Sequence, residues 1–200
     1  MARRPRVATQ EQVELRPGLT PDPFDERVVA AYWIGNELLE KVAASPFFES
    51  LGDRFRPRMT GGDFGWLATK FEQGARPHHN FHVFEIHTRA GLMRNEKAHI
   101  ALETMDSCRI SWGKVAAIEG DELLVERPAL VLAAGKLALS EPRATRVTRQ
   151  IGPHGFVDGV QPGGHVSIHW DWACQVLSAP ALARVQAATS RYLDLANQTI

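Results

Sequence analysis

The feature that most constrains the fold of this chain is a change of pattern at Cys108. Beyond that residue, short apolar or alternating runs are separated by turn sequences, such as those at 119–121 and 134–136, each with a central glycine. We expect strands over 114–118, 123–126, 130–133, 137–139, 143–150 and 165–170. Short strands at this spacing are typical of a small antiparallel β-barrel or a curled sheet.

The part of the chain before Cys108 has helical spacing instead. Apolar residues recur at helical intervals from Asp25 to about Ala44, although Gly35 and Asn36 can interrupt that helix. Further helices are expected over 63–74 and 95–107, and a closing helix is expected from residue 178. We therefore predict an α+β fold with three parts. These are a flexible arm (1–23), an α-helical module (24–107) and an OB-like antiparallel β-barrel with a C-terminal helix (108–200).

Charge and composition exclude several classes of protein. Lys and Arg total 23, and Asp and Glu also total 23, so no net positive charge favours nucleic acid. No run approaches the roughly 20 apolar residues that a membrane helix requires, and the N-terminus has no apolar signal-peptide core. We expect a cytoplasmic protein that binds neither nucleic acid nor a membrane. Its two cysteines are then free thiols, with Cys174 expected in the core.

A run of histidines follows Pro77 and is the densest group of chemically active residues. If a helix starts at Pro77, positions i, i+4 and i+7 place His78, His82 and Glu85 on one face. Two histidines one helical turn apart and a carboxylate form a common metal-ligand set. The alternative is that this face is simply solvated, which is the more frequent situation for such a helix. The remaining two histidines of the run, His79 and His87, are expected on the surface.

Two segments of the second half carry a resemblance to a known protein family. Cys108 to Val115 reads Cys-Arg-Ile-Ser-Trp-Gly-Lys-Val, and Gly163 to Ala173 reads Gly-Gly-His-Val-Ser-Ile-His-Trp-Asp-Trp-Ala. Together they resemble the HypC/HupF family of small chaperones used in nickel-iron hydrogenase maturation. In that family the cysteine directly follows the initiator methionine, and a proline stands at the position of Trp112. The whole chain is also similar to an uncharacterised family associated with hydrogenase genes.

The resemblance implies a function in metal assembly. The family's cysteine and histidine hold an iron atom that carries cyanide and carbon monoxide, and these roles fall on Cys108 and His169. The implied partner is a hydrogenase large-subunit precursor or a maturation scaffold protein. A thiolate and an imidazole suit low-spin ferrous iron and leave positions open for diatomic ligands. The resemblance thus implies an assembly chaperone without turnover of its own.

Two other functions are open from the residues alone. One is a metal-dependent enzyme, with zinc or iron held by His78, His82 and Glu85 and with Cys108 as catalytic nucleophile or additional ligand. The other is a metal-free module that uses the barrel only for docking. The sequence has no phosphate-binding glycine loop, no Cys-x-x-Cys pair and no dinucleotide fingerprint, and this favours the chaperone over the enzyme.

Overall fold

The structure of this chain is a computed structural model, which describes residues 22–43, 47–49, 60–86, 98–198 and 200. The chain divides into two compact units, Met1–Phe81 and His82–Ile200. We call them the helical unit and the barrel unit and describe each by itself. The helix that ends at Cys108 belongs to the barrel unit.

The described elements of the helical unit are all helices. They are α2 (Glu26–Trp33), α3 (Glu37–Lys41), α5 (Gly61–Glu72) and α6 (His79–Phe81). The predicted interruption at Gly35 and Asn36 is confirmed. Gly35 has a φ of 87°, which glycine adopts without steric cost. The Asn36 side chain then accepts a hydrogen bond from the Leu38 amide at 2.9 Å and so begins α3.

The barrel unit contains η2 (His82–Ile86), α8 (Ala98–Cys108) and α9 (Ala179–Ala196) besides its strands. The predicted closing helix is confirmed as α9. Its N-cap is Ser178, whose hydroxyl accepts a hydrogen bond from the Ala181 amide at 3.4 Å, and Pro180 occupies the first turn. Helix α9 contacts η2, β1, β4 and β9. It therefore packs against the barrel rather than extending away from it.

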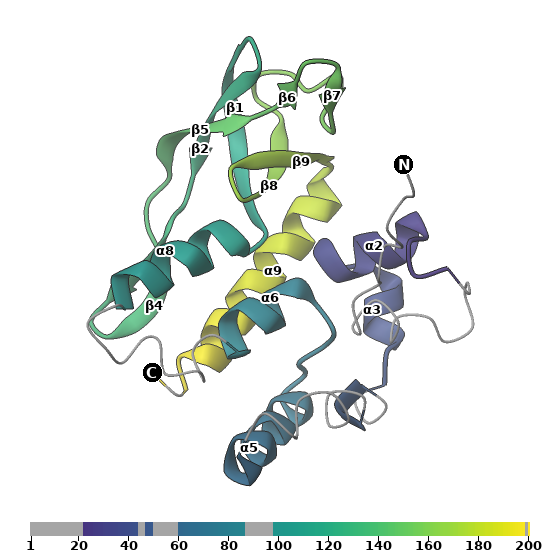
Figure 1. Ribbon diagram of the computed structural model, residues 1–200, viewed down its shortest axis with the longest axis vertical. Helices are drawn as coiled ribbons and strands as arrows, with labels where there is room; N and C mark the ends of the chain where they lie inside the picture. Colours follow the sequence, from purple (N-terminus) through teal and green to yellow (C-terminus); the bar gives the residue numbers. More distant parts are fainter. Residues whose placement is uncertain (1–21, 44–46, 50–59, 87–97, 199) are drawn as a thin grey trace, which may run out of the picture. The chain divides into compact units, whose positions relative to one another are not determined.

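The predicted barrel is present and closed. The strands among the described residues are β1 (Ser111–Glu119), β2 (Glu122–Arg127), β3 (Leu130–Ala133), β4 (Lys136–Leu139), β5 (Arg143–Thr148), β6 (Gln150–Ile151), β7 (His154–Gly155), β8 (His165–His169) and β9 (Trp172–Leu177). Five of them close the barrel in the order β1-β2-β5-β9-β8 (Figure 1). Four of the junctions are antiparallel, whereas β5 pairs with β9 in parallel through Thr148 and Trp172. Strands β3-β4 and β6-β7 form two separate hairpins.

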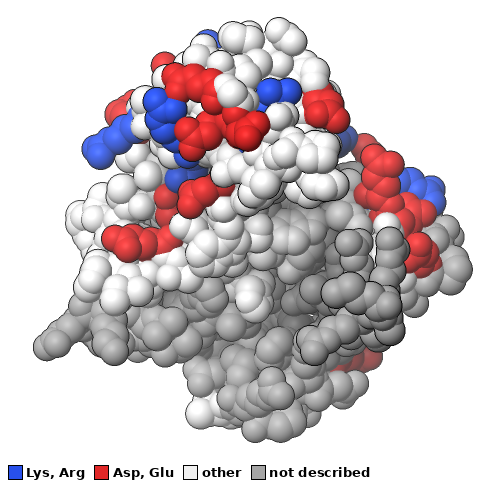
Figure 2. Space-filling view, turned by 45° about the horizontal axis from the view of Figure 1, so that its top comes forward, with Lys and Arg blue, Asp and Glu red and all other residues white. Residues whose placement is uncertain are grey.

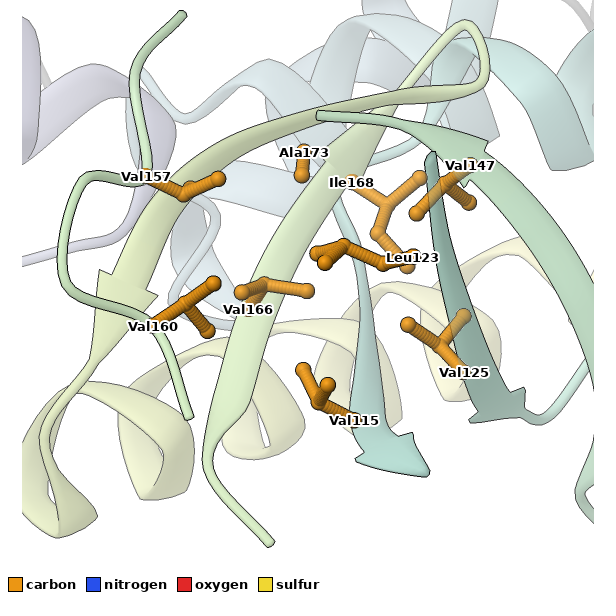
Figure 3. Packing of buried hydrophobic residues seen from close by; sticks show 9 residues of the cluster. All are labelled: Val115, Leu123, Val125, Val147, Val157, Val160, Val166, Ile168 and Ala173. Carbon is orange, nitrogen blue, oxygen red and sulfur yellow. The ribbon is translucent and has the colours of Figure 1, made fainter. Parts of the chain in front are cut away.

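Small and branched apolar side chains fill the barrel (Figure 3). The cluster comprises Val115, Leu123, Val125, Val147, Val157, Val160, Val166, Ile168 and Ala173. Gly113 faces this core, where a Cβ atom would lie 2.9 Å from Val125 Cβ and 3.1 Å from Ile168 Cδ1. Only glycine therefore allows β1 to approach β2 and β8 this closely.

The last strand of the barrel, β9, was not predicted from the sequence. We expected the final strand to end at Trp170, but the chain turns at Trp170 and Asp171 and returns as β9. The prediction for Cys174 was also wrong. Cys174 was expected in the core, but it is exposed and lies on β9 where the β8–β9 register shifts between Ser167 and Ile168. A bulged residue has no direct partner on the opposite strand, so alternation does not predict its side.

On the face that Figure 2 shows, acidic and basic side chains are interspersed over the barrel. One example is Arg146, which pairs with Glu119 and with Glu122. This mixture agrees with the equal numbers of acidic and basic residues in the chain. Among the residues that the structure describes, no helix has the length and apolar character needed to cross a membrane.

Candidate metal site

Cys108 and His169, the two predicted ligands of the barrel unit, lie side by side. Cys108 is the last residue of α8 and His169 is the last residue of β8. Strand β1 starts three residues after Cys108 and pairs with β8, with Ser111 opposite Ile168. This register brings the start of β1 to the end of β8. The Cys108 sulfur and a His169 ring nitrogen lie within 4.8 Å of one another.

A main-chain hydrogen bond fixes this arrangement. The Trp170 amide donates to the Ser107 carbonyl at 2.9 Å. The last carbonyl groups of an α-helix lack partners within the helix, so the β8–β9 turn caps the end of α8. Because Ser107 and Trp170 are the chain neighbours of Cys108 and His169, the bond holds the two candidate ligands next to each other.

The turn itself has an unusual conformation. Trp170 and Asp171 have φ values of 48° and 62°, as in a type I′ hairpin turn, where Asn and Gly are preferred. A residue with a Cβ atom costs about 1–2 kcal/mol in the left-handed region. The Trp170 ring also lies edge to face with that of His169, with centroids 6.3 Å apart.

Burial keeps both candidate ligands neutral at neutral pH. It raises the pKa of the Cys108 thiol, while the hydrogen bond from Trp170 acts in the opposite direction. Burial also lowers the pKa of His169. The imidazole therefore has a lone pair available, whereas the thiol has to lose its proton when a metal binds.

The donor set and its spacing fit one metal ion. A thiolate binds zinc at about 2.3 Å and an imidazole nitrogen at about 2.0 Å. Two donor atoms within 4.8 Å of one another need only a small side-chain adjustment to reach the same ion. Soft thiolate and borderline imidazole suit iron or zinc better than magnesium or calcium.

An ion-pair network anchors the end of α8 to the barrel. Asp106 accepts hydrogen bonds from Arg109 and Arg127, each at 2.9 Å, and from the Leu130 amide at 2.7 Å. Arg127 also donates to the Ser111 hydroxyl at 2.9 Å. The charge of Asp106 is paired with two arginines, and burial is the main cause of the raised pKa of Cys108.

Arg109 is the most deeply buried member of this network. It has no exposed surface, and it donates to the Pro128 carbonyl at 2.6 Å as well as to Asp106. Burial lowers its pKa to about 10, although the negative charge of Asp106 opposes that shift. Arg109 therefore remains charged at neutral pH and depends on Asp106 for compensation. Nothing in the sequence pattern marked these three charged residues as a unit.

The histidine-rich run does not continue as a regular α-helix. His78 precedes α6, and η2, which begins at His82 and includes Glu85, is a π-helix. The i, i+4, i+7 spacing of an α-helix therefore does not apply to this run, because a π-helix closes its hydrogen bonds one residue later. His78 and Glu85 are buried and His82 is half-buried. The His78 Nδ1 atom accepts a hydrogen bond from the Asn80 amide at 3.0 Å.

His79 was expected on the surface, but it is buried. Its Nδ1 atom lies 3.2 Å from the Tyr32 hydroxyl, and its ring lies against that of Trp33 with centroids 4.3 Å apart. These aromatic partners are far away in the sequence, so local periodicity did not indicate them. His87 lies outside the described residues.

No curated protein and no solved structure matches the chain. Residues 17–200 match a protein family described as a family of unknown function, DUF6390, and that match covers both the helical unit and the barrel unit. The chain therefore belongs to the DUF6390 family.

Proposed function

We propose that this chain is an assembly chaperone of the HypC/HupF type, with an OB-like barrel that carries iron as cargo. In this proposal Cys108 and His169 bind an iron fragment with cyanide and carbonyl ligands. The protein delivers it, together with a maturation scaffold protein, to a hydrogenase large-subunit precursor. The proposal concerns a carrier, so no residue is assigned a catalytic step.

The observation that supports it most is the juxtaposition of Cys108 and His169 within 4.8 Å. The two residues are about sixty positions apart in the sequence, and each terminates its own element. The family resemblance that pointed to these two residues rests on their sequence motifs and not on a structure, so their proximity is a separate observation. A pair of metal-binding side chains that meet in this way is the arrangement that a two-ligand carrier requires.

The internal position of Cys108 limits how this chain would bind iron. A cysteine that follows an initiator methionine can offer a terminal amine beside its thiol, whereas the Cys108 nitrogen is part of an amide. The barrel unit would therefore contribute the Cys108 thiolate and the His169 imidazole, with coordination positions left for the diatomic ligands of the cargo.

The proposal predicts a specific spectroscopic signature. Protein purified without oxygen from its native cells should contain iron, with infrared bands from cyanide and carbonyl stretching. Cys108→Ala and His169→Ala should each lose the bands and most of the iron, because each substitution removes one of the proposed iron ligands. Infrared spectroscopy and metal analysis on the same samples measure both quantities.

Matched controls are available for each ligand. Cys174→Ala changes the other cysteine, which is exposed on β9, and His165→Ala changes the other histidine of β8. Both variants should keep the iron and the bands. Bands that persist in Cys108→Ala, or iron that is lost equally from Cys174→Ala, would contradict the proposal.

A metal-free docking function is the second candidate, and exposed apolar side chains favour it. Ile151 and Phe156 on and beside the β6–β7 hairpin are 63% and 69% exposed, and the Phe156 ring contacts that of Trp172. Such side chains often mark interaction sites. If the native protein contains no metal, and Cys108→Ala still binds partner proteins like the wild type, docking alone becomes the better account.

A further inference from the structure

An arginine occupies a core-facing position at the end of β2. Side chains alternate along a strand, so Arg127 lies on the same face as Leu123 and Val125, which belong to the barrel core. Its side chain is only 11% exposed. A charge that is taken out of water is costly unless it is paired and hydrogen-bonded. The groups that the guanidinium binds therefore have to account for its presence at this end of the barrel.

All three nitrogens of the Arg127 guanidinium donate hydrogen bonds. Nη1 donates to Asp106 Oδ2 at 2.9 Å, Nη2 donates to the Asp106 carbonyl at 2.7 Å, and Nε donates to the Ser111 hydroxyl at 2.9 Å. The Asp106 carbonyl belongs to the last turn of α8, where carbonyls lack partners within the helix. Arg127 therefore binds both the side chain and the main chain of α8, two residues before Cys108.

The Ser111 hydroxyl extends this contact to β8. Ser111 is fully buried, and its hydroxyl donates to the Ile168 carbonyl at 3.3 Å. A hydroxyl has one donor and two acceptor positions, so it accepts from Arg127 and donates to Ile168 at the same time. Ile168 directly precedes His169, the last residue of β8. One guanidinium is thus linked to the end of α8 and, through one hydroxyl, to the end of β8.

We infer that Arg127 is a positioning residue, whose guanidinium holds the ends of α8 and β8 at the spacing that Cys108 and His169 need to bind one metal ion. This role rests on the proposed function only in taking those two residues as ligands. Residues that orient metal ligands affect metal affinity without touching the metal. Neither the motif resemblance nor the family match assigns a role to Arg127.

The hold on the two ends can be measured without a metal. The Trp170 amide donates to the Ser107 carbonyl at 2.9 Å and so joins the same two ends. Hydrogen exchange of this amide, followed by NMR in the metal-free full chain, reports how often they separate. Dividing its rate by that of the Leu123 amide, in the barrel core, separates this local opening from a change in the stability of the whole barrel.

Three substitutions test the hold. Arg127→Lys keeps the charge but replaces the planar fork by a single nitrogen. Ser111→Ala leaves Arg127 on Asp106 and removes only the link to β8. Ser167→Ala is the matched control, because Ser167 is also a buried serine but lies on β8 outside this chain of hydrogen bonds. Circular dichroism verifies that each variant is folded.

The exchange rate of Trp170 relative to Leu123 should rise about tenfold in Arg127→Lys, the size expected for loss of a hydrogen bond to a charged group. It should rise about threefold in Ser111→Ala, which loses only the weaker link. The ratio in Ser167→Ala should equal the wild-type ratio.

Metal binding measures the consequence for the site. In a Cys174→Ala background, Co²⁺ bound to the Cys108 thiolate gives a thiolate-to-cobalt charge-transfer band, and its titration yields Kd. The Kd should rise about tenfold in Arg127→Lys, as for other residues that orient metal ligands, and less in Ser111→Ala. The band should persist in both variants, because both ligands remain. Ser167→Ala should bind Co²⁺ like the wild type.

Exchange ratios in Arg127→Lys and Ser111→Ala that equal the ratio in Ser167→Ala would overturn the inference. So would a raised ratio with an unchanged Kd for Co²⁺, because Arg127 would then stabilise the fold without positioning the ligands. Failure of the proposed function gives a different result. The wild-type protein would then show no charge-transfer band, whereas the exchange ratios would still decide whether Arg127 holds the two ends together.

Discussion

Burial acts on both candidate ligands by disfavouring their charged forms. The charged form of cysteine is the deprotonated one, so the pKa of Cys108 rises, whereas the charged form of histidine is the protonated one, so the pKa of His169 falls. Between these two pKa values both side chains are neutral. A metal that binds there displaces one proton, from Cys108, and none from His169.

This charge state predicts how metal affinity depends on pH. Within the window bounded by the lowered pKa of His169 and the raised pKa of Cys108, the Kd for Zn²⁺ should fall about tenfold for each unit of increase in pH, the dependence for release of one proton. Below the His169 pKa the slope should steepen, because the imidazole then has to lose a proton as well. Competition with a zinc-binding dye across pH measures the slope.

Cys108→Ala is the control for this slope. It should weaken binding and also remove the dependence within the window, since no thiol proton remains to be displaced. An affinity that does not change with pH in the wild-type protein would show that the Cys108 thiol is not a ligand.

At the scale of elements, helix α8 is held to the barrel by charge rather than by apolar contacts alone. Asp106 accepts hydrogen bonds from Arg109, from Arg127 and from the Leu130 amide. Removing it would leave the fully buried Arg109 without its counter-charge. Loss of one partner of a buried pair costs more than the pair contributes, because the remaining charge stays desolvated.

Asp106→Ala should therefore lower the free energy of unfolding by about 2–4 kcal/mol. Urea unfolding followed by circular dichroism measures the change. Glu103→Ala, on the exposed side of the same helix, is the control and should change stability by no more than about 0.5 kcal/mol. Equal effects of the two substitutions would mean that Asp106 does not anchor α8.

Elements whose ends are marked by capping residues, proline or glycine could be predicted from the sequence. Elements without such residues at their ends could not. The Ser178 cap with Pro180 marks the start of α9, and Gly35 with Asn36 marks the break between α2 and α3. The turn before β9 has no such mark, because Trp170, its first residue, is not a typical turn residue and tertiary contacts hold it in place. The π-helical turn from His82 likewise has no distinct sequence pattern.

At the scale of the whole molecule, the sequence indicates helices followed by strands but not which strands close the barrel. The pairing of β1 with β8 and of β5 with β9 joins segments far apart in the chain, and periodicity within a strand does not specify its partner. The meeting of Cys108 and His169 depends on this closure. The motif resemblance identified both residues as candidate ligands, but only the folded structure shows how close together they lie.

In the proposed function, Cys108 and His169 bind the same metal ion. X-ray absorption spectroscopy at the metal edge of the loaded full-length protein tests it directly, because it reports which atoms are bound. We predict one sulfur at about 2.3 Å and imidazole nitrogen in the wild type and in Cys174→Ala, and loss of the sulfur in Cys108→Ala. A spectrum without sulfur in the wild type, or one that keeps its sulfur in Cys108→Ala, would contradict the account.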